Sequence, residues 1–135
     1  MSSVDERARV LVVDDEPSLC RALTIAFTRA GYYVRALERG EAAEALLHEE
    51  SFDCLVVDLR MPDMRGDVLY ATAAALQPRL AECTVFTTGD ASQRARELLE
   101  DCGCPVVIQK PFDLDELLDV VGDMTARVQR TKARG

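Results

Sequence analysis

The chain alternates short apolar runs with longer segments in which apolar residues recur at helical spacing. The clearest run is 54–58, where four apolar residues, rich in branched side chains, precede a carboxylate. A run of this kind is too short for a helix and is typical of a strand buried on both faces. The same pattern predicts strands at residues 9–13, 32–36, 54–58, 83–87 and 106–108.

Helical periodicity fills the intervals between these strands. After Pro17, which suits a first helical turn, Leu19, Leu23 and Phe27 recur four residues apart until Gly31. Comparable apolar stripes predict helices over residues 17–30, 40–49, 67–77, 91–102 and from 113 onward. Strands and helices thus alternate five times, which favours a single doubly wound α/β domain with a parallel five-stranded sheet and five helices. We expect residues 1–8 to be a flexible N-terminus, 9–126 the folded domain, and 127–135 a fraying basic tail or a truncated linker.

Composition and charge narrow the class of protein. The chain has 135 residues, of which 48% are hydrophobic and 30% charged, as is ordinary for one globular domain. Its net charge of −8 disfavours nonspecific attraction to nucleic acid or to an anionic membrane. Neither an apolar run of about 20 residues nor the apolar core of a signal peptide occurs in the sequence, so we expect a cytoplasmic protein.

The cysteines fit a packed interior better than a reactive site. Four of the five fall inside apolar strand or helix patterns, which predicts reduced, buried thiols. Cys102 and Cys104 are separated by one residue, which differs from the two-residue spacing of redox and zinc motifs. The four cysteines predicted to be buried are Cys20, Cys54, Cys83 and Cys102.

Polar residues follow the predicted strands at the points where the strands end. Asp14 and Asp15 follow the first strand, Asp58 ends the third, Thr88 follows the fourth, and Lys110 follows the fifth. Because parallel strands end at one edge of the sheet, where such folds bind ligands, these side chains should meet in one cleft.

The chemistry of that cleft can be predicted from its residue types. Three carboxylates close together raise one another's pKa values unless a cation lies among them. Mg²⁺ (or Mn²⁺) accepts oxygen ligands and commonly uses one or two carboxylates beside a phosphate, which leaves a carboxylate oxygen able to attack phosphorus. A lysine and a hydroxyl would stabilise the charge of a phosphoryl group. The residues therefore predict a site at which an aspartate is phosphorylated.

With these motifs in place, the sequence resembles the response-regulator receiver domains of two-component signalling. The resemblance spans about residues 8–126 and is specific because five separated motifs occur in the right order. It implies the flavodoxin-like strand order 2-1-3-4-5. The motifs are Asp14-Asp15, Asp58, Met61-Pro62, Thr88-Gly89 and Lys110-Pro111-Phe112.

The resemblance also implies a role for each site residue. Asp58 would be the phosphoacceptor, taking a phosphoryl group from a kinase phosphohistidine. Asp15 and Asp58 would bind Mg²⁺ directly, Asp14 would bind it mainly through water, and the backbone carbonyl of Arg60 would complete the protein ligands.

Two further residues would stabilise the phosphoryl group. Lys110 would pair with its oxygens, and Thr88 would turn inward to hydrogen-bond them. The Lys110-Pro111 peptide bond would be cis, so that the ammonium points at the site.

The implied partners are proteins. A sensor histidine kinase or a phosphotransfer protein would supply the phosphoryl group, and a downstream protein would bind the surface formed by the fourth helix, fifth strand and fifth helix. A homodimer is a further option, and we expect no direct contact with nucleic acid or membrane. The chain would be a signalling phosphoacceptor rather than an enzyme, with Mg²⁺-dependent self-phosphorylation and autodephosphorylation as its only chemistry.

Three residues depart from the commonest receiver pattern and could modulate the site. Val107 stands where receivers usually carry an aromatic switch residue, so the movement of Thr88 could act on the fourth helix instead. Arg60 places a long cation at the rim of the cleft, which predicts slow or unusual autodephosphorylation. Asp90 borders the same cleft.

Other functions remain open at this stage. A Mg²⁺-dependent aspartyl phosphohydrolase would carry a second Asp where Arg60 stands, and a nucleotide binder would not place Asp14 and Asp15 in its phosphate loop. A phosphorylation-independent interaction module is disfavoured by the intact site. The domain could also be a receiver excised from a hybrid histidine kinase.

Overall fold

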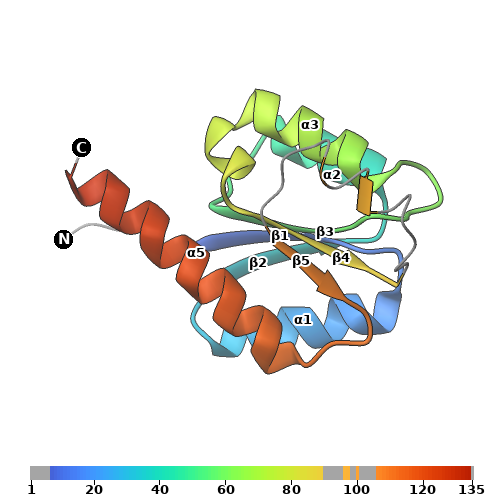
Figure 1. Ribbon diagram of the computed structural model, residues 1–135, viewed down its shortest axis with the longest axis horizontal. Helices are drawn as coiled ribbons and strands as arrows, with labels where there is room; N and C mark the ends of the chain where they lie inside the picture. The colour runs from blue at the N-terminus through green and yellow to red at the C-terminus, as the bar shows by residue number, and fades with distance from the viewer. Residues whose placement is uncertain (1–6, 90–95, 98–99, 101–105, 135) are drawn as a thin grey trace.

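Five parallel strands form one sheet in the order β2-β1-β3-β4-β5, as the resemblance implied (Figure 1). The computed structural model describes residues 7–89, 96–97, 100 and 106–134, without the side chains of 127–134. The strands are β1 (Arg9–Val13), β2 (Tyr33–Leu37), β3 (Cys54–Asp58), β4 (Thr84–Thr88) and β5 (Val106–Gln109).

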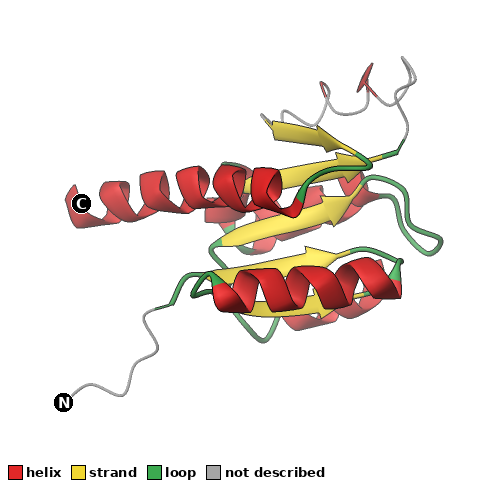
Figure 2. Cartoon of the chain, turned by 90° about the horizontal axis from the view of Figure 1, so that it is seen from below, coloured by secondary structure: helices red, strands yellow, loops and turns green. Residues whose placement is uncertain are grey.

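Helices cover both faces of this sheet (Figure 2). α2 (Gly40–Leu47) and α3 (Gly66–Leu76) lie on one face, and α1 (Pro17–Arg29) and α5 (Leu114–Arg134) lie on the other. A 3₁₀ turn, η1 (Pro78–Ala81), follows α3. The helix predicted over 91–102 lies mostly outside the described residues.

Alternation along the central strands explains why they are apolar throughout. Leu11 and Val57 pack in the cluster under α2 and α3, whereas Val12 and Val56 pack in the cluster against α1 and α5. Each central strand therefore contributes side chains to two cores, which confirms that both of its faces are buried.

The predicted element boundaries need small corrections. β2 and β4 each begin and end one residue later than predicted. Tyr32 lies outside β2 because its backbone N–H donates to the carbonyl of Phe27 in α1, at 3.0 Å. Gly31, with a φ of 96°, ends that helix in the left-handed conformation that glycine adopts readily. β4 reaches Thr88 because that residue pairs with Gln109 of β5.

The segment after residue 126, predicted to be a fraying basic tail or a truncated linker, is part of a helix. α5 continues to Arg134. The sequence after Gly122 contains neither Pro nor Gly until residue 135, so nothing in it ends the helix earlier. Of the segment predicted to be a flexible N-terminus, residues 1–6 lie outside the described part, and the carbonyl of Ala8 already accepts a hydrogen bond from Tyr33.

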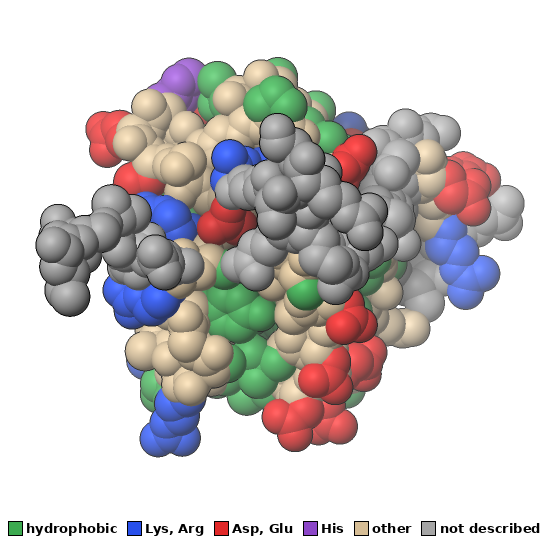
Figure 3. Space-filling model, turned by 90° about the vertical axis from the view of Figure 1, so that its left-hand side faces the viewer, with side chains coloured by type: hydrophobic (Ala, Val, Ile, Leu, Met, Phe, Trp, Pro, Cys, Tyr) green, Lys and Arg blue, Asp and Glu red, His purple; other side chains and the backbone are tan. Residues whose placement is uncertain are grey.

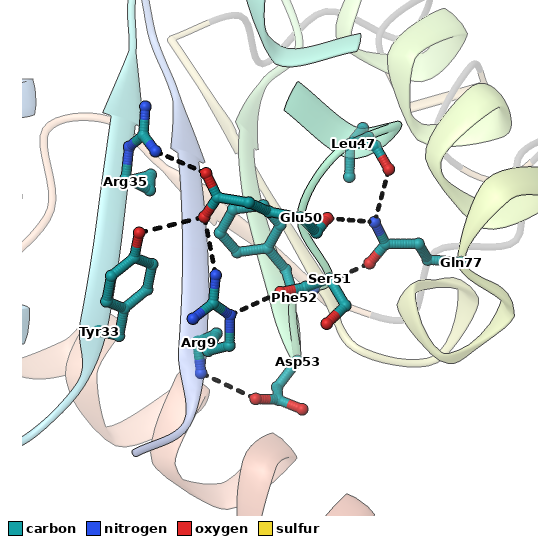
Figure 4. Close-up of polar contacts among 9 residues, drawn as sticks. All are labelled: Arg9, Tyr33, Arg35, Leu47, Glu50, Ser51, Phe52, Asp53 and Gln77. Atoms are coloured by element: carbon teal, nitrogen blue, oxygen red, sulfur yellow. Dashed lines mark hydrogen bonds and ion pairs between the residues drawn. The ribbon is translucent and has the colours of Figure 1, made fainter. Parts of the chain in front are cut away.

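At the amino ends of the strands, a polar network joins the elements (Figure 4). Glu50 accepts hydrogen bonds from Arg9 and Arg35, both at 2.7 Å, and from the hydroxyl of Tyr33 at 3.1 Å. Asp53 accepts the backbone N–H of Arg9 at 2.8 Å. On this side of the molecule, basic and acidic side chains lie next to one another (Figure 3). The network fastens the edge of the sheet that lies opposite the strand carboxyl ends.

Two further expectations concern burial. Cys20, Cys54 and Cys83 are buried, reduced thiols as predicted, and Cys102 lies outside the described residues. Within the described part of the chain, none of the helices combines the length and apolar character needed to cross a bilayer.

Candidate functional site

The carboxyl ends of β1 and β3 bring three carboxylates together. Oxygen atoms of Asp14, Asp15 and Asp58 all lie within 4.8 Å of one another. Asp14 and Asp58 are buried, with 2% and 6% of their surface exposed, whereas Asp15 is exposed to solvent. The cluster is therefore closed on the side of the sheet and open on the side from which a ligand would arrive.

Backbone hydrogen bonds fix the strand ends that carry these groups. The N–H of Asp14 donates to Leu37 at the end of β2, and the N–H of Leu59, next to Asp58, donates to Thr87 of β4. The N–H of Lys110 donates to the carbonyl of Thr88 at 2.7 Å. These bonds hold the strand ends that carry Asp14, Asp58, Thr88 and Lys110 in register, with Thr88 itself only 4% exposed.

Lys110 bridges the two buried carboxylates. Its ammonium nitrogen lies 2.8 Å from Oδ2 of Asp14 and 3.0 Å from Oδ2 of Asp58. Burial lowers the pKa of Lys110, but the hydrogen bonds from its ammonium to Asp14 and Asp58 outweigh that effect and hold the pKa above its usual value. The lysine is therefore a fixed positive charge at the site.

The environment of Asp58 disfavours its charged form, whereas that of Lys110 favours the charge. Burial raises the pKa of Asp58 above its usual value, by more than the hydrogen bonds from Lys110 and from the backbone N–H of Arg60 lower it. Its Oδ1 accepts the Arg60 N–H at 3.1 Å, and its Oδ2 accepts Lys110. The cluster of three carboxylates contains one lysine, bonded to Asp14 and Asp58, so negative charge is in excess and part of it lies on the buried Asp58.

Asp14 is held by the start of α1 rather than acting as its N-cap. Its Oδ1 accepts the backbone N–H of Glu16 at 2.9 Å, and Glu16 occupies the N-cap position. Its carbonyl accepts the thiol of Cys20 at 3.2 Å. Burial and the neighbouring charge of Asp14 raise the pKa of Cys20 to about 11, so this thiol stays protonated beside the site.

This donor set suits a hard divalent cation. Carboxylate oxygens are the ligands that Mg²⁺ prefers, and the three of them leave a net negative charge even after pairing with Lys110. The exposed Asp15 gives the ion access while Asp14 and Asp58 stay fixed by backbone bonds. The residues present therefore fit the predicted Mg²⁺, and the Arg60 carbonyl stays a predicted further ligand.

The segment after β3 packs tightly against the site. The backbone N–H of Gly66 donates to the carbonyl of Leu59 at 2.8 Å, which closes the β3–α3 loop, defined as residues 59–65, at its base. A Cβ atom on Gly66 would lie 2.3 Å from the carbonyl oxygen of Asp58. Only a glycine permits this close approach to the backbone of the site.

One residue with a place in this loop was missed by the sequence analysis. The carboxylate of Asp63 accepts the backbone N–H groups of Gly40 and Glu41 at 3.1 and 3.0 Å, and these bonds lower its pKa. A signal was present in the sequence: the helix beginning at Gly40 is preceded by Arg39, which is a poor N-cap, so an acceptor from elsewhere was needed.

Two of the three predicted modulating residues lie in the described part of the chain, and both are exposed. Arg60, two residues after the end of β3, is exposed, and Val107 of β5 is 43% exposed. Asp90 lies outside the described residues. The Lys110-Pro111 peptide bond is cis, as predicted.

Comparisons of the sequence and the fold with known proteins all indicate one family. The sequence matches the family model of the response regulator receiver domain over residues 10–122. It is 36% identical to the transcriptional regulatory protein KdpE of Mycobacterium tuberculosis over 125 residues, which cover 92% of this chain and 52% of that protein. The chain thus spans about half the length of this relative.

Two further proteins match over most of this chain. The response regulator receiver protein CpdR of Brucella abortus is 34% identical over 86% of this chain and 95% of its own length. A crystal structure of a response regulator protein from Burkholderia pseudomallei, described as having a phosphorylated aspartic acid, a calcium ion and citrate, superposes with a TM-score of 0.77. That structure is 27% identical, over 93% of this chain and 73% of the solved one.

Proposed function

We propose that this chain, which belongs to the response-regulator receiver family, is a phosphoacceptor that takes a phosphoryl group from a kinase phosphohistidine onto Asp58. The observation that carries the proposal is the geometry around Asp58. A buried carboxylate lies within 4.8 Å of two others and 3.0 Å from a lysine ammonium. The phosphorylated aspartic acid of the Burkholderia response regulator supports the same chemistry.

The transfer needs one bond to form and one to break. A carboxylate oxygen of Asp58 attacks phosphorus, and the bond from phosphorus to the histidine nitrogen breaks. The imidazole leaves with the electron pair and then takes up a proton. Lys110 is placed to stabilise the phosphoryl oxygens, and its bond to Asp14 keeps the ammonium at the site when Asp58 is modified.

Asp14, Asp15 and Asp58 would hold Mg²⁺, together with the carbonyl of Arg60. When bound, this ion neutralises charge on the phosphoryl group and on the carboxylates. The chain's own contribution is to keep these ligands fixed at the ends of β1 and β3 and to expose Asp15 to the incoming ion. Thr88 would turn toward the phosphoryl group once it is attached.

The partners in this proposal are other proteins. A sensor histidine kinase or a phosphotransfer protein supplies the phosphoryl group. The surface that switches would consist of β5, α5 and the helix predicted over 91–102. The chain acts as a signalling phosphoacceptor rather than an enzyme on separate substrates, without direct binding to nucleic acid or membrane. A cytoplasmic location, predicted from the sequence, belongs to the same proposal.

Incubation with acetyl phosphate and Mg²⁺ tests the proposal without the cognate kinase. Intact-mass spectrometry is expected to show the mass of one added phosphoryl group, and chelation of the metal with EDTA is expected to prevent it. A wild-type chain that stays unmodified with both acetyl phosphate and a phosphohistidine donor would refute the proposal.

Arg60→Ala is expected to shorten the lifetime of the phosphorylated state severalfold. The exposed arginine lies two residues after Asp58, where its side chain would contact the phosphoryl group or hinder an attacking water. The lifetime is measured from the decay of the phosphorylated mass after the donor is removed. Arg79→Ala is the control, because Arg79 pairs with Asp53 at the opposite edge of the sheet. Equal lifetimes for Arg60→Ala and the wild type would contradict the prediction.

A further inference from the structure

We infer that Asp63 is a positioning residue for the metal site. Its hydrogen bonds to the first turn of α2 hold the β3–α3 loop in place. The inference rests on the proposed function, because the metal ligand that it positions, the carbonyl of Arg60, belongs to that proposal. Asp63 itself is not among the residues expected to touch the ion.

The contact joins two segments that are far apart in the sequence. Both carboxylate oxygens of Asp63 are used: Oδ1 accepts the N–H of Gly40 at 3.1 Å, and Oδ2 accepts the N–H of Glu41 at 3.0 Å. These donors belong to the first turn of α2, whose N–H groups have no partner within the helix. The α2 N-cap residue, Arg39, makes no side-chain capping bond. Asp63 therefore supplies from the loop the cap that α2 lacks.

The surrounding packing leaves this contact little freedom. A Cβ atom on Gly40 would lie 2.9 Å from Cβ of Met64, so the loop touches the start of α2 directly. Met64 packs in turn against the core under α2 and α3. At its base the loop is closed by the bond from Gly66 to Leu59. The loop is thus fixed at its base and at Asp63.

Arg60 lies between these two fixed points. Its backbone N–H donates to Asp58, and the direction of its carbonyl depends on the conformation of the loop. Asp63 and Asp15 also line one open pocket, together with Glu38, Arg39 and Pro62. Asp63 therefore lines the same pocket as one predicted metal ligand, Asp15, and lies three residues along the chain from another, Arg60. Loss of the bonds from Asp63 should let the loop move and so displace the Arg60 carbonyl. Removal of a group that orients a metal ligand typically weakens metal binding by about 10–100-fold.

Titration of Mg²⁺ into the purified, unphosphorylated chain tests the inference directly. Asp63→Ala removes both acceptors and is expected to weaken Mg²⁺ binding by about tenfold, as measured by calorimetry. Asp63→Asn keeps one carbonyl acceptor, so we expect a smaller loss of affinity. It also preserves the test if the alanine variant does not fold.

Asp53→Ala is the matched control. Asp53 likewise accepts a backbone N–H, that of Arg9, but it does so at the opposite edge of the sheet (Figure 4). We expect this variant to lower the melting temperature while Mg²⁺ affinity stays that of the wild type.

Two results would overturn the inference alone: wild-type Mg²⁺ affinity in Asp63→Ala, or an equal loss of affinity in Asp53→Ala. A wild-type chain that binds no Mg²⁺ and accepts no phosphoryl group would overturn the proposed function as well, so the two failures can be told apart.

Discussion

Asp58→Asn is expected to abolish the phosphorylated mass completely while making the metal-free fold more stable at neutral pH. The amide has no anionic oxygen to attack phosphorus. Neither Asp14 nor Asp15 can replace Asp58, because Asp14 is bound to Glu16 and Lys110, and Asp15 lies on the exposed side of the cluster. A gain in stability would also show that the lost activity does not result from unfolding.

The expected gain follows from the raised pKa of Asp58. An unfolded aspartate has a pKa near 3.8, and burial raises the pKa of Asp58 in the fold. A group of this kind contributes most to stability below its unfolded pKa, and that contribution is lost as the pH rises through its folded pKa. At neutral pH the ionised Asp58 therefore opposes folding, and asparagine removes the charge. The difference in melting temperature between variant and wild type should shrink when the pH is lowered toward 3.8.

The matched variant for this experiment is Asp53→Asn, which removes the same charge at the opposite edge of the sheet. It is expected to keep the phosphorylated mass. Saturating Mg²⁺ should stabilise the wild type and Asp53→Asn, because a ligand that binds only the folded state stabilises it. A phosphorylated mass on Asp58→Asn would assign the phosphoacceptor to another residue.

The sheet was predictable because strands that are buried on both faces are apolar at nearly every position. Residues 9–13 and 54–58 are strands with the predicted bounds, since every second side chain enters one of two cores. The end of β4 was harder to predict. Thr88 is polar, and its pairing with Gln109 of β5 carries the strand to that residue. Hydrogen bonds between strands leave no periodicity in the sequence.

The convergence of the site residues was predictable for a different reason. Parallel strands end at one edge, so polar residues after consecutive strands must approach one another. What topology does not give is the pairing among them, and the bridge from Lys110 to both Asp14 and Asp58 emerged only from the structure. Asp63 was missed because the poor N-cap Arg39 indicates only that α2 needs an acceptor from elsewhere. No residue type identifies Asp63, which lies 22 and 23 residues from the two backbone N–H groups, as that acceptor.

Gly66→Ala is expected to destabilise the fold by about 2 kcal/mol, although alanine is the better helix former. Its Cβ atom would lie 2.3 Å from the carbonyl oxygen of Asp58 and 2.8 Å from Cα of Leu59. Both are backbone atoms of the segment that carries the phosphoacceptor, so relief requires α3 or the end of β3 to move. The gain in helix propensity, at most about 1 kcal/mol, does not offset this overlap. Chemical denaturation measures the difference in unfolding free energy.

Gly122→Ala is the control, because the same substitution is expected to stabilise the fold at this position. Gly122 lies inside α5, and its Cβ atom would meet only the Tyr32 hydroxyl, at an ordinary contact distance of 3.7 Å. Helix propensity should then dominate and stabilise the fold by about 0.5–1 kcal/mol. Because the clash at Gly66 involves the backbone of Asp58, Gly66→Ala should also slow phosphorylation by acetyl phosphate, whereas Gly122→Ala should not. Equal stability of the two variants would mean that the β3–α3 loop yields easily, which contradicts the rigid support that we assign to the site.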